Sequence, residues 1–144
     1  MRIGAILGGA GTEIEHAMAT YGAHLGTAFQ LIDDVLDYSG DNAVIGKNVG
    51  DDLAEGKTTL PLIYVMKHGT AAQSQLVRRA IEQGGLEELH AVLDAIRASG
   101  ALEYARTQAQ AEARAACTAL DPVPHSNHRG YLLQLADFAV TRTF

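Results

Sequence analysis

Apolar residues recur at the spacing of an amphipathic helix along nearly the whole chain, and no segment shows the strict alternation typical of a β-strand. Glycine, proline and short polar residues interrupt this pattern at intervals, as they do at helix ends. The pattern predicts helices over residues 1–9, 12–38, 60–68, 71–83, 86–99, 101–120 and 127–142. We therefore expect an all-α fold, organised as a single domain over residues 1–144.

The longest predicted helix, over residues 12–38, is apolar around most of its circumference. Thr12 and Glu15 have the spacing of a capping box, in which each side chain bonds the backbone of the other residue, and this pair predicts the helix start. At 1.5 Å per residue, the helix would extend for roughly 40 Å. A helix that is apolar on most sides needs neighbours around it, so we expect a long central helix within a bundle.

Near its C-terminal end, this helix carries a narrow acidic stripe. At about 100° per residue, Asp33, Asp34 and Asp37 fall within one arc, and Gln30 lies on the same arc. Like charges three or four residues apart destabilise a helix by roughly 0.2–0.5 kcal/mol per pair, and the helix dipole disfavours acids near a C-terminus by roughly 0.3–1 kcal/mol. Mg²⁺ binds carboxylate and phosphate oxygens and would offset both costs. A solvated acidic face without a ligand is the alternative.

The segment that follows has the composition of an anion-binding loop. Residues 39–59 contain four glycines and two lysines, Lys47 and Lys57. Glycine-rich backbone can bring N–H groups close to an anion, and lysine ammonium groups bind phosphate oxygens as point charges. The segment lacks the spacing of a P-loop, and no strand precedes it. Two ordinary solvated lysines are the alternative, but their position directly after three aspartates favours a joint metal and diphosphate site.

Two stretches of sequence, within residues 29–61 and just beyond, closely resemble a known motif. FQLIDDVLDYSGD begins at Phe29, and GKNVGDDLAEGKTTLPLIY begins at Gly46. Together they are similar to the second aspartate-rich region of the trans-polyprenyl diphosphate synthases, in particular the bacterial long-chain members. The similarity is dense from Leu25 to Met66 and continues more weakly to the C-terminus. The DDxxD motif alone would be weak evidence for this family. Its combination with the preceding Phe-Gln pair and both lysine-containing motifs is highly specific for it.

The resemblance implies a fold, a reaction and roles for individual residues. The fold would be the isoprenoid-synthase-type helical bundle. The reaction would be the Mg²⁺-dependent elongation of an allylic prenyl diphosphate with isopentenyl diphosphate. The implied magnesium ligands are Asp33, Asp34 and Asp37, and the implied diphosphate-binding residues are Lys47 and Lys57. The residues expected to line the substrate pocket, where small side chains leave room for a prenyl chain, are Gln30, Phe29, Gly26 and Thr27.

The sequence also departs from the family pattern. The family carries two aspartate-rich motifs that face each other, and this chain has only the second, because Asp51 and Asp52 lack the further aspartate that would complete another. The resemblance thus covers the C-terminal part of a synthase, and we expect the chain to be inactive by itself. A non-catalytic truncated homologue, acting as an interaction or regulatory subunit of a full-length synthase, is the alternative. Uncovered apolar surface on the long helix would favour a homo-oligomer.

Composition and charge indicate which partners and which cellular location to expect. A net charge of −6 without a basic cluster argues against nucleic-acid binding. The sequence has no stretch of about 20 apolar residues, so we expect no membrane-spanning helix. The apolar run after Met1 is too short for a signal peptide, and the one cysteine, Cys117, gives no sign of an oxidising compartment. We therefore expect a cytoplasmic protein.

Overall fold

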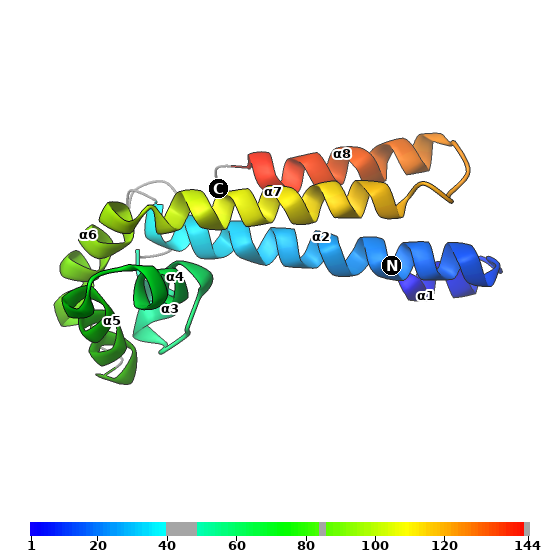
Figure 1. The fold of residues 1–144 in the computed structure, drawn as a ribbon. Helices are drawn as coiled ribbons and strands as arrows, with labels where there is room; N and C mark the ends of the chain where they lie inside the picture. Colours follow the sequence, from blue (N-terminus) through cyan, green and yellow to red (C-terminus); the bar gives the residue numbers. More distant parts are fainter. Residues whose placement is uncertain (40–48, 84–85, 143–144) are drawn as a thin grey trace. The chain divides into compact units, whose positions relative to one another are not determined.

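The computed structural model describes residues 1–39, 49–83 and 86–142, and Figure 1 shows their arrangement as a ribbon. Within these ranges there are helices and loops but no β-strand, which confirms the predicted all-α fold. The helices are α1 (Arg2–Leu7), α2 (Thr12–Ser39), α3 (Asp51–Ala54), α4 (Leu60–His68), α5 (Ala71–Gln83), the 3₁₀ turn η1 (Leu86–Glu88), α6 (Leu89–Ser99), α7 (Ala101–Ala119) and α8 (Asn127–Thr141). None of the described helices is both long enough and apolar enough to cross a lipid bilayer.

The long helix α2 begins at Thr12, but its cap differs from the one that the sequence predicts. The N–H of Glu15 donates to the carbonyl of Gly11 at 3.0 Å, which makes Gly11 the N-cap and Thr12 the first helical residue. The predicted capping box is therefore wrong. The carboxylate of Glu15 instead forms an ion pair with Arg2 of α1 at 2.7 Å. With 28 residues, α2 is about 42 Å long, close to the predicted length.

Capping side chains fix the ends of the later helices. The N–H of Gln73 donates to Thr70 Oγ1 at 3.2 Å, and the N–H of Thr70 donates to Gln73 Oε1 at 2.8 Å, so a capping box does start α5. Ser126 Oγ accepts the N–H of Arg129 at 3.2 Å and starts α8. Both helices thus begin where the sequence predicts.

Contacts within the chain divide it into two compact units. Unit 1 contains residues 1–32 and 108–142, and unit 2 contains residues 33–107. Both α2 and α7 cross the boundary, so each contributes to both units. The single domain expected over residues 1–144 is not tested by this division and stays a prediction.

The core of unit 1 forms where α2, α7 and α8 lie side by side (Figure 1). Tyr21 of α2 is fully buried, and its hydroxyl donates to the carbonyl of Leu132 in α8 at 2.8 Å. Around it lie the buried residues Ala116, Leu120 and Ala136. Small alanine side chains let the helix backbones approach closely, and the buried tyrosine fills the remaining space with its hydroxyl satisfied.

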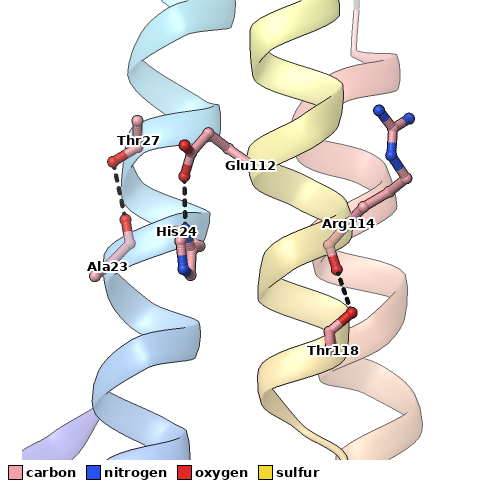
Figure 2. Close-up of polar contacts among 6 residues, drawn as sticks. All are labelled: Ala23, His24, Thr27, Glu112, Arg114 and Thr118. Carbon is pink, nitrogen blue, oxygen red and sulfur yellow. Dashed lines mark hydrogen bonds and ion pairs between the residues drawn. The ribbon is translucent and has the colours of Figure 1, made fainter.

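A polar contact also links α2 and α7 within unit 1. His24 Nδ1 and Glu112 Oε2 are 2.6 Å apart, and each side chain is only about one-third exposed. Figure 2 shows these side chains reaching toward each other between the two helices. The contact joins residues 88 positions apart in the sequence, so it helps to fix which faces of α2 and α7 meet.

The core of unit 2 forms where α4, α5 and α6 pack against one another. Its buried apolar side chains are those of Tyr38, Leu53, Leu62, Val65, Val77, Ala80, Val92, Leu93, Ala95, Ile96 and Ala101. Tyr38 comes from the end of α2 and Leu53 from the short helix α3. The three-helix core therefore anchors both the acidic end of α2 and the short helix α3.

Candidate metal and diphosphate site

The three predicted magnesium ligands lie in the last two turns of α2, in unit 2. Asp34 is buried, with 7% of its surface exposed, whereas Asp33 and Asp37 are half-buried. The last turn of α2 contains no basic residue. The helix dipole disfavours carboxylates at this end by roughly 0.3–1 kcal/mol each, and partial burial adds a desolvation cost. Acidic residues at the end of α2 thus lower the stability of the helix. The same residues are suited to bind a cation.

A buried tyrosine next to these aspartates is also affected by a fourth carboxylate. Tyr38 is 1% exposed, and the hydroxyl of Thr59 donates to Tyr38 Oη at 3.4 Å. Burial raises the pKa of Tyr38 above its ordinary value, the hydrogen bond from Thr59 lowers it, and three carboxylates raise it further, namely those of Asp37, Asp52 and Asp34. The carboxylate of Asp52 in α3 therefore acts on the same hydroxyl as those of Asp34 and Asp37 in α2. No pattern in the sequence predicts this effect of Asp52.

A glycine docks α3 against the end of α2. The N–H of Gly50 donates to the carbonyl of Asp37 at 3.2 Å. Gly50 has a φ of +86°, a left-handed conformation that strains other residues. A Cβ at this position would also stand 2.5 Å from Leu89 Cδ1. This turn brings Asp52, and the chain that follows it, to the acidic end of α2.

The predicted diphosphate ligand Lys57 lies directly after α3 with an exposed side chain. Its Nζ is 2.9 Å from Asp52 Oδ1 and 2.7 Å from Glu55 Oε2. Hydrogen bonds to Glu55 and Asp52 raise the pKa of Lys57 well above its ordinary value, so the ammonium stays charged at physiological pH. The sequence predicted a lysine available to an anion, whereas the structure has it paired with two local carboxylates.

The backbone around Lys57 is held by a Schellman motif, the hydrogen-bonded turn that ends many helices. The N–H of Lys57 donates to the carbonyl of Asp52 at 2.8 Å, and the N–H of Gly56 donates to the carbonyl of Leu53 at 3.0 Å. Gly56 has a φ of +70°, as the motif requires. The position from which Lys57 extends is therefore set by α3 and not by a free loop.

Replacing Gly56 with alanine should test this turn. A Cβ there would make only ordinary contact, at 3.6 Å from the carbonyl oxygen of Ile81, so the expected cost comes from the left-handed backbone. We expect Gly56→Ala to lower the free energy of unfolding in urea by about 1–2 kcal/mol. The matched control is Gly130→Ala in α8, where a Cβ meets nothing within 4 Å and the helix favours alanine. Equal stabilities of the two variants would contradict the assignment.

Three of the four predicted pocket residues line one open groove in unit 1. Gly26, Phe29 and Gln30 of α2 border a groove of about 610 Å³, and Met1 and Leu135 are also among its lining residues. Its lining is largely apolar. A groove of this size and character falls in the range of small-molecule sites. The role of these residues toward a prenyl chain stays a prediction.

The fourth, Thr27, is not among the residues that line this groove. It is exposed, and its hydroxyl donates to the carbonyl of Ala23 in its own helix at 3.1 Å (Figure 2). A threonine whose hydroxyl is hydrogen-bonded to the preceding turn presents a small, largely apolar side chain on the helix surface. Its predicted contact with substrate is therefore not supported by the groove and stays a prediction.

An arginine that the sequence did not single out covers one side of Phe29. The guanidinium of Arg142 lies 3.8 Å from the centroid of the Phe29 ring, and its Nη2 donates to the Phe29 carbonyl at 3.0 Å. These residues lie 113 positions apart in the chain. A cation over an aromatic face is a favourable contact, and here it holds the phenyl ring beside the groove.

The donor chemistry of the end of α2 fits magnesium, although not as a complete site. Carboxylate oxygens are the protein ligands that Mg²⁺ prefers, and the ion commonly keeps waters and takes substrate phosphates as further ligands. Among the residues that the structure describes, no group of three or more His, Cys, Asp or Glu side chains is arranged to hold a metal ion. Lys47 lies outside the described residues. The assignments of Asp33, Asp34, Asp37, Lys47 and Lys57 therefore stay predictions.

Comparison with known proteins identifies the family. A sequence profile described as polyprenyl synthetase matches residues 1–97, about two thirds of the chain, and the chain therefore belongs to the polyprenyl synthetase family. Octaprenyl diphosphate synthase of Escherichia coli (strain K12) is 52% identical over 138 residues, which are 95% of this chain and 43% of that protein. All-trans-nonaprenyl-diphosphate synthase (geranyl-diphosphate specific) of Rhodobacter capsulatus is 43% identical over 130 residues, 90% of this chain and 40% of that protein. The chain thus spans less than half the length of these relatives.

Solved structures confirm the expected helical fold of the isoprenoid synthases. Polyprenyl synthase from Caulobacter crescentus CB15, in complex with calcium and isoprenyl diphosphate, superposes with a TM-score of 0.89 at 38% identity, covering 99% of this chain and 44% of that chain. Geranylgeranyl pyrophosphate synthase from Corynebacterium glutamicum, in complex with isoprenyl diphosphate and magnesium, gives a TM-score of 0.81 at 30% identity, covering 93% and 39% of the two chains.

Proposed function

We propose that this chain is the metal- and diphosphate-binding part of a prenyltransferase that elongates an allylic prenyl diphosphate with isopentenyl diphosphate. The observation that carries the proposal is the juxtaposition at the end of α2. The N–H of Gly50, the N-cap of α3, donates to the carbonyl of Asp37 at 3.2 Å, and Asp52 of α3 holds Lys57 at 2.9 Å. Relatives in the same family have been solved with divalent cations and isoprenyl diphosphate, which supports this chemistry.

The residues of the chain have complementary roles in this proposal. Asp33, Asp34 and Asp37 supply oxygen ligands to magnesium, and Lys57, with Lys47, supplies positive charge to the diphosphate. When bound, magnesium stabilises the negative charge that develops on the departing diphosphate. The lysine contributes the same kind of stabilisation from a fixed position, and preorganised charge of this kind is usually the largest catalytic term. The apolar groove beside Gly26, Phe29 and Gln30 would hold the prenyl chain.

A second candidate function follows from how little of its relatives' length the chain spans. It matches 43% of the Escherichia coli protein, and its sequence contains one DDxxD motif. Such a chain would fit a non-catalytic subunit that binds a full-length synthase. A homo-oligomer and a cytoplasmic location are further parts of the proposal. Activity measurements with and without an added synthase separate this candidate from the first.

Calorimetry tests the site directly. We expect inorganic diphosphate to bind the chain clearly tighter when Mg²⁺ is present, because Mg²⁺ keeps its waters at a partial acidic site unless phosphate oxygens replace them. Asp33→Ala should abolish this dependence on Mg²⁺. The matched control is Asp94→Ala, which removes an exposed carboxylate on α6. Equal diphosphate affinity with and without Mg²⁺, or an unchanged response in Asp33→Ala, would count against the site.

A further inference from the structure

We propose that Asp52 is a positioning residue that holds Lys57 for its anion, and that Glu55 occupies the place on the Lys57 ammonium that the diphosphate takes. This inference rests on the proposed function, in which Lys57 binds the diphosphate. It goes further by assigning opposite roles to the two carboxylates that contact the same ammonium group. The carboxylate of Asp52 stays on the ammonium when the anion binds, and the carboxylate of Glu55 leaves it.

The contacts of Lys57 define the two roles. Its Nζ lies 2.9 Å from Asp52 Oδ1 and 2.7 Å from Glu55 Oε2, both within hydrogen-bond distance. An ammonium group has three N–H donors, and here two of them are directed to carboxylates. A diphosphate that approaches the remaining donor meets the negative charge of two carboxylates at hydrogen-bond distance from the same ammonium. Release of one carboxylate would remove its repulsion and free a second donor for the anion.

The surroundings of the two carboxylates indicate which one leaves. The Asp52 side chain is 17% exposed, and the Asp52 carbonyl accepts the N–H of Lys57 at 2.8 Å. Asp52 is thus bonded to Lys57 through both backbone and side chain. The Glu55 side chain is 62% exposed, and Glu55 is the C-cap residue at the end of α3. An exposed glutamate returns to water at little cost, whereas a largely buried aspartate does not.

The position of Asp52 also indicates its role when it stays bound to the Lys57 ammonium. Asp52 follows Gly50 by two residues, and the N–H of Gly50 donates to the carbonyl of Asp37 at 3.2 Å. A lysine held by Asp52 is therefore held beside the predicted magnesium ligands. The ammonium and the metal would then meet the same diphosphate from neighbouring positions, and the diphosphate would displace Glu55.

Affinity measurements on four variants test the inference. The probe is inorganic diphosphate with Mg²⁺, titrated into the 144-residue chain. We expect Glu55→Gln to bind the probe about two- to five-fold tighter, because a competing ion pair is removed, and Asp52→Asn to bind it about two- to five-fold weaker. Asp52→Glu should recover part of the loss. The control is Glu82→Gln, an exposed position on α5 that changes the net charge equally.

The direction of the two effects separates positioning from simple charge. If only negative charge mattered, neutralising either carboxylate would tighten anion binding, so tighter binding by Asp52→Asn would overturn the inference. A Glu55→Gln affinity equal to that of Glu82→Gln would also overturn it. Lys57→Gln tests the underlying function separately. If Lys57→Gln leaves the affinity unchanged, the proposed diphosphate site itself is wrong, whereas if it weakens binding and the carboxylate variants do not differ, only this inference fails.

Discussion

We expect the 144-residue chain, purified by itself, to show no measurable prenyl transfer. Its sequence carries a single DDxxD motif, whereas the resemblance to the synthases implies two that face each other, so we expect half of the metal ligands to be missing from this polypeptide. Positioning and charge stabilisation supply most of the rate in such reactions, and loss of one preorganised group typically costs about 10²–10³ in kcat. The loss of a whole motif should therefore lower the rate beyond detection.

A radiometric assay with farnesyl diphosphate, isopentenyl diphosphate and Mg²⁺ would measure this rate. A full-length octaprenyl diphosphate synthase, assayed in parallel, shows that the substrates and conditions support the reaction. An active chain, elongating farnesyl diphosphate at an ordinary enzymatic rate, would refute the prediction. It would also mean that the residues present here suffice for catalysis.

Most of the helices were predictable because each of them has a sufficient local signal. Thr59 and Gly69 bound α4 as expected, and Thr70 starts α5 through a capping box with Gln73. The capping box predicted at Thr12 is wrong, because Gly11 caps α2 and Glu15 pairs with Arg2 instead. Glu15 has a competing partner that the sequence could not reveal, since that partner depends on where α1 packs.

The short helix α3 was missed for a different reason. It has only four residues, Asp51–Ala54, so it is too short to show apolar periodicity, and it lies in a glycine-rich segment that predicts a loop. The position of α3 depends on the bond between Gly50 and the Asp37 carbonyl. The paired state of Lys57 and the effect of Asp52 on Tyr38 depend on α3. No local pattern encodes them.

The candidate site therefore divides into two kinds of residues. Asp33, Asp34 and Asp37 were predictable because three carboxylates near a helix C-terminus are costly and their spacing matches a specific motif. Asp52 and Arg142 acquire their places only through packing, since Asp52 reaches the site by way of α3, and Arg142 reaches Phe29 from 113 positions away. Tertiary contacts of this kind require the structure.

We also expect this chain to associate in solution as a dimer or larger species. In unit 1, α8 exposes an apolar stripe of three side chains at helical spacing, namely Tyr131 at 63%, Leu135 at 37% and Phe138 at 46% exposure. Helix α1 adds Ile3 at 72% and Leu7 at 83% exposure. Monomers rarely leave a continuous apolar patch of more than a few hundred Å² open to water. Burial of this surface between two copies would remove it from water.

Light scattering coupled to size exclusion would measure the mass of the species in solution. Phe138→Glu, which places a charge at the centre of the α8 stripe, should shift the population toward monomer because burying an unpaired carboxylate is costly. The matched control is Gln110→Glu, which adds the same charge at an exposed polar position of α7 and should leave the association unchanged. A wild-type chain that remains monomeric up to its solubility limit would refute the prediction. Equal dissociation of both variants would instead mean that net charge opposes association and that the stripe is not the interface.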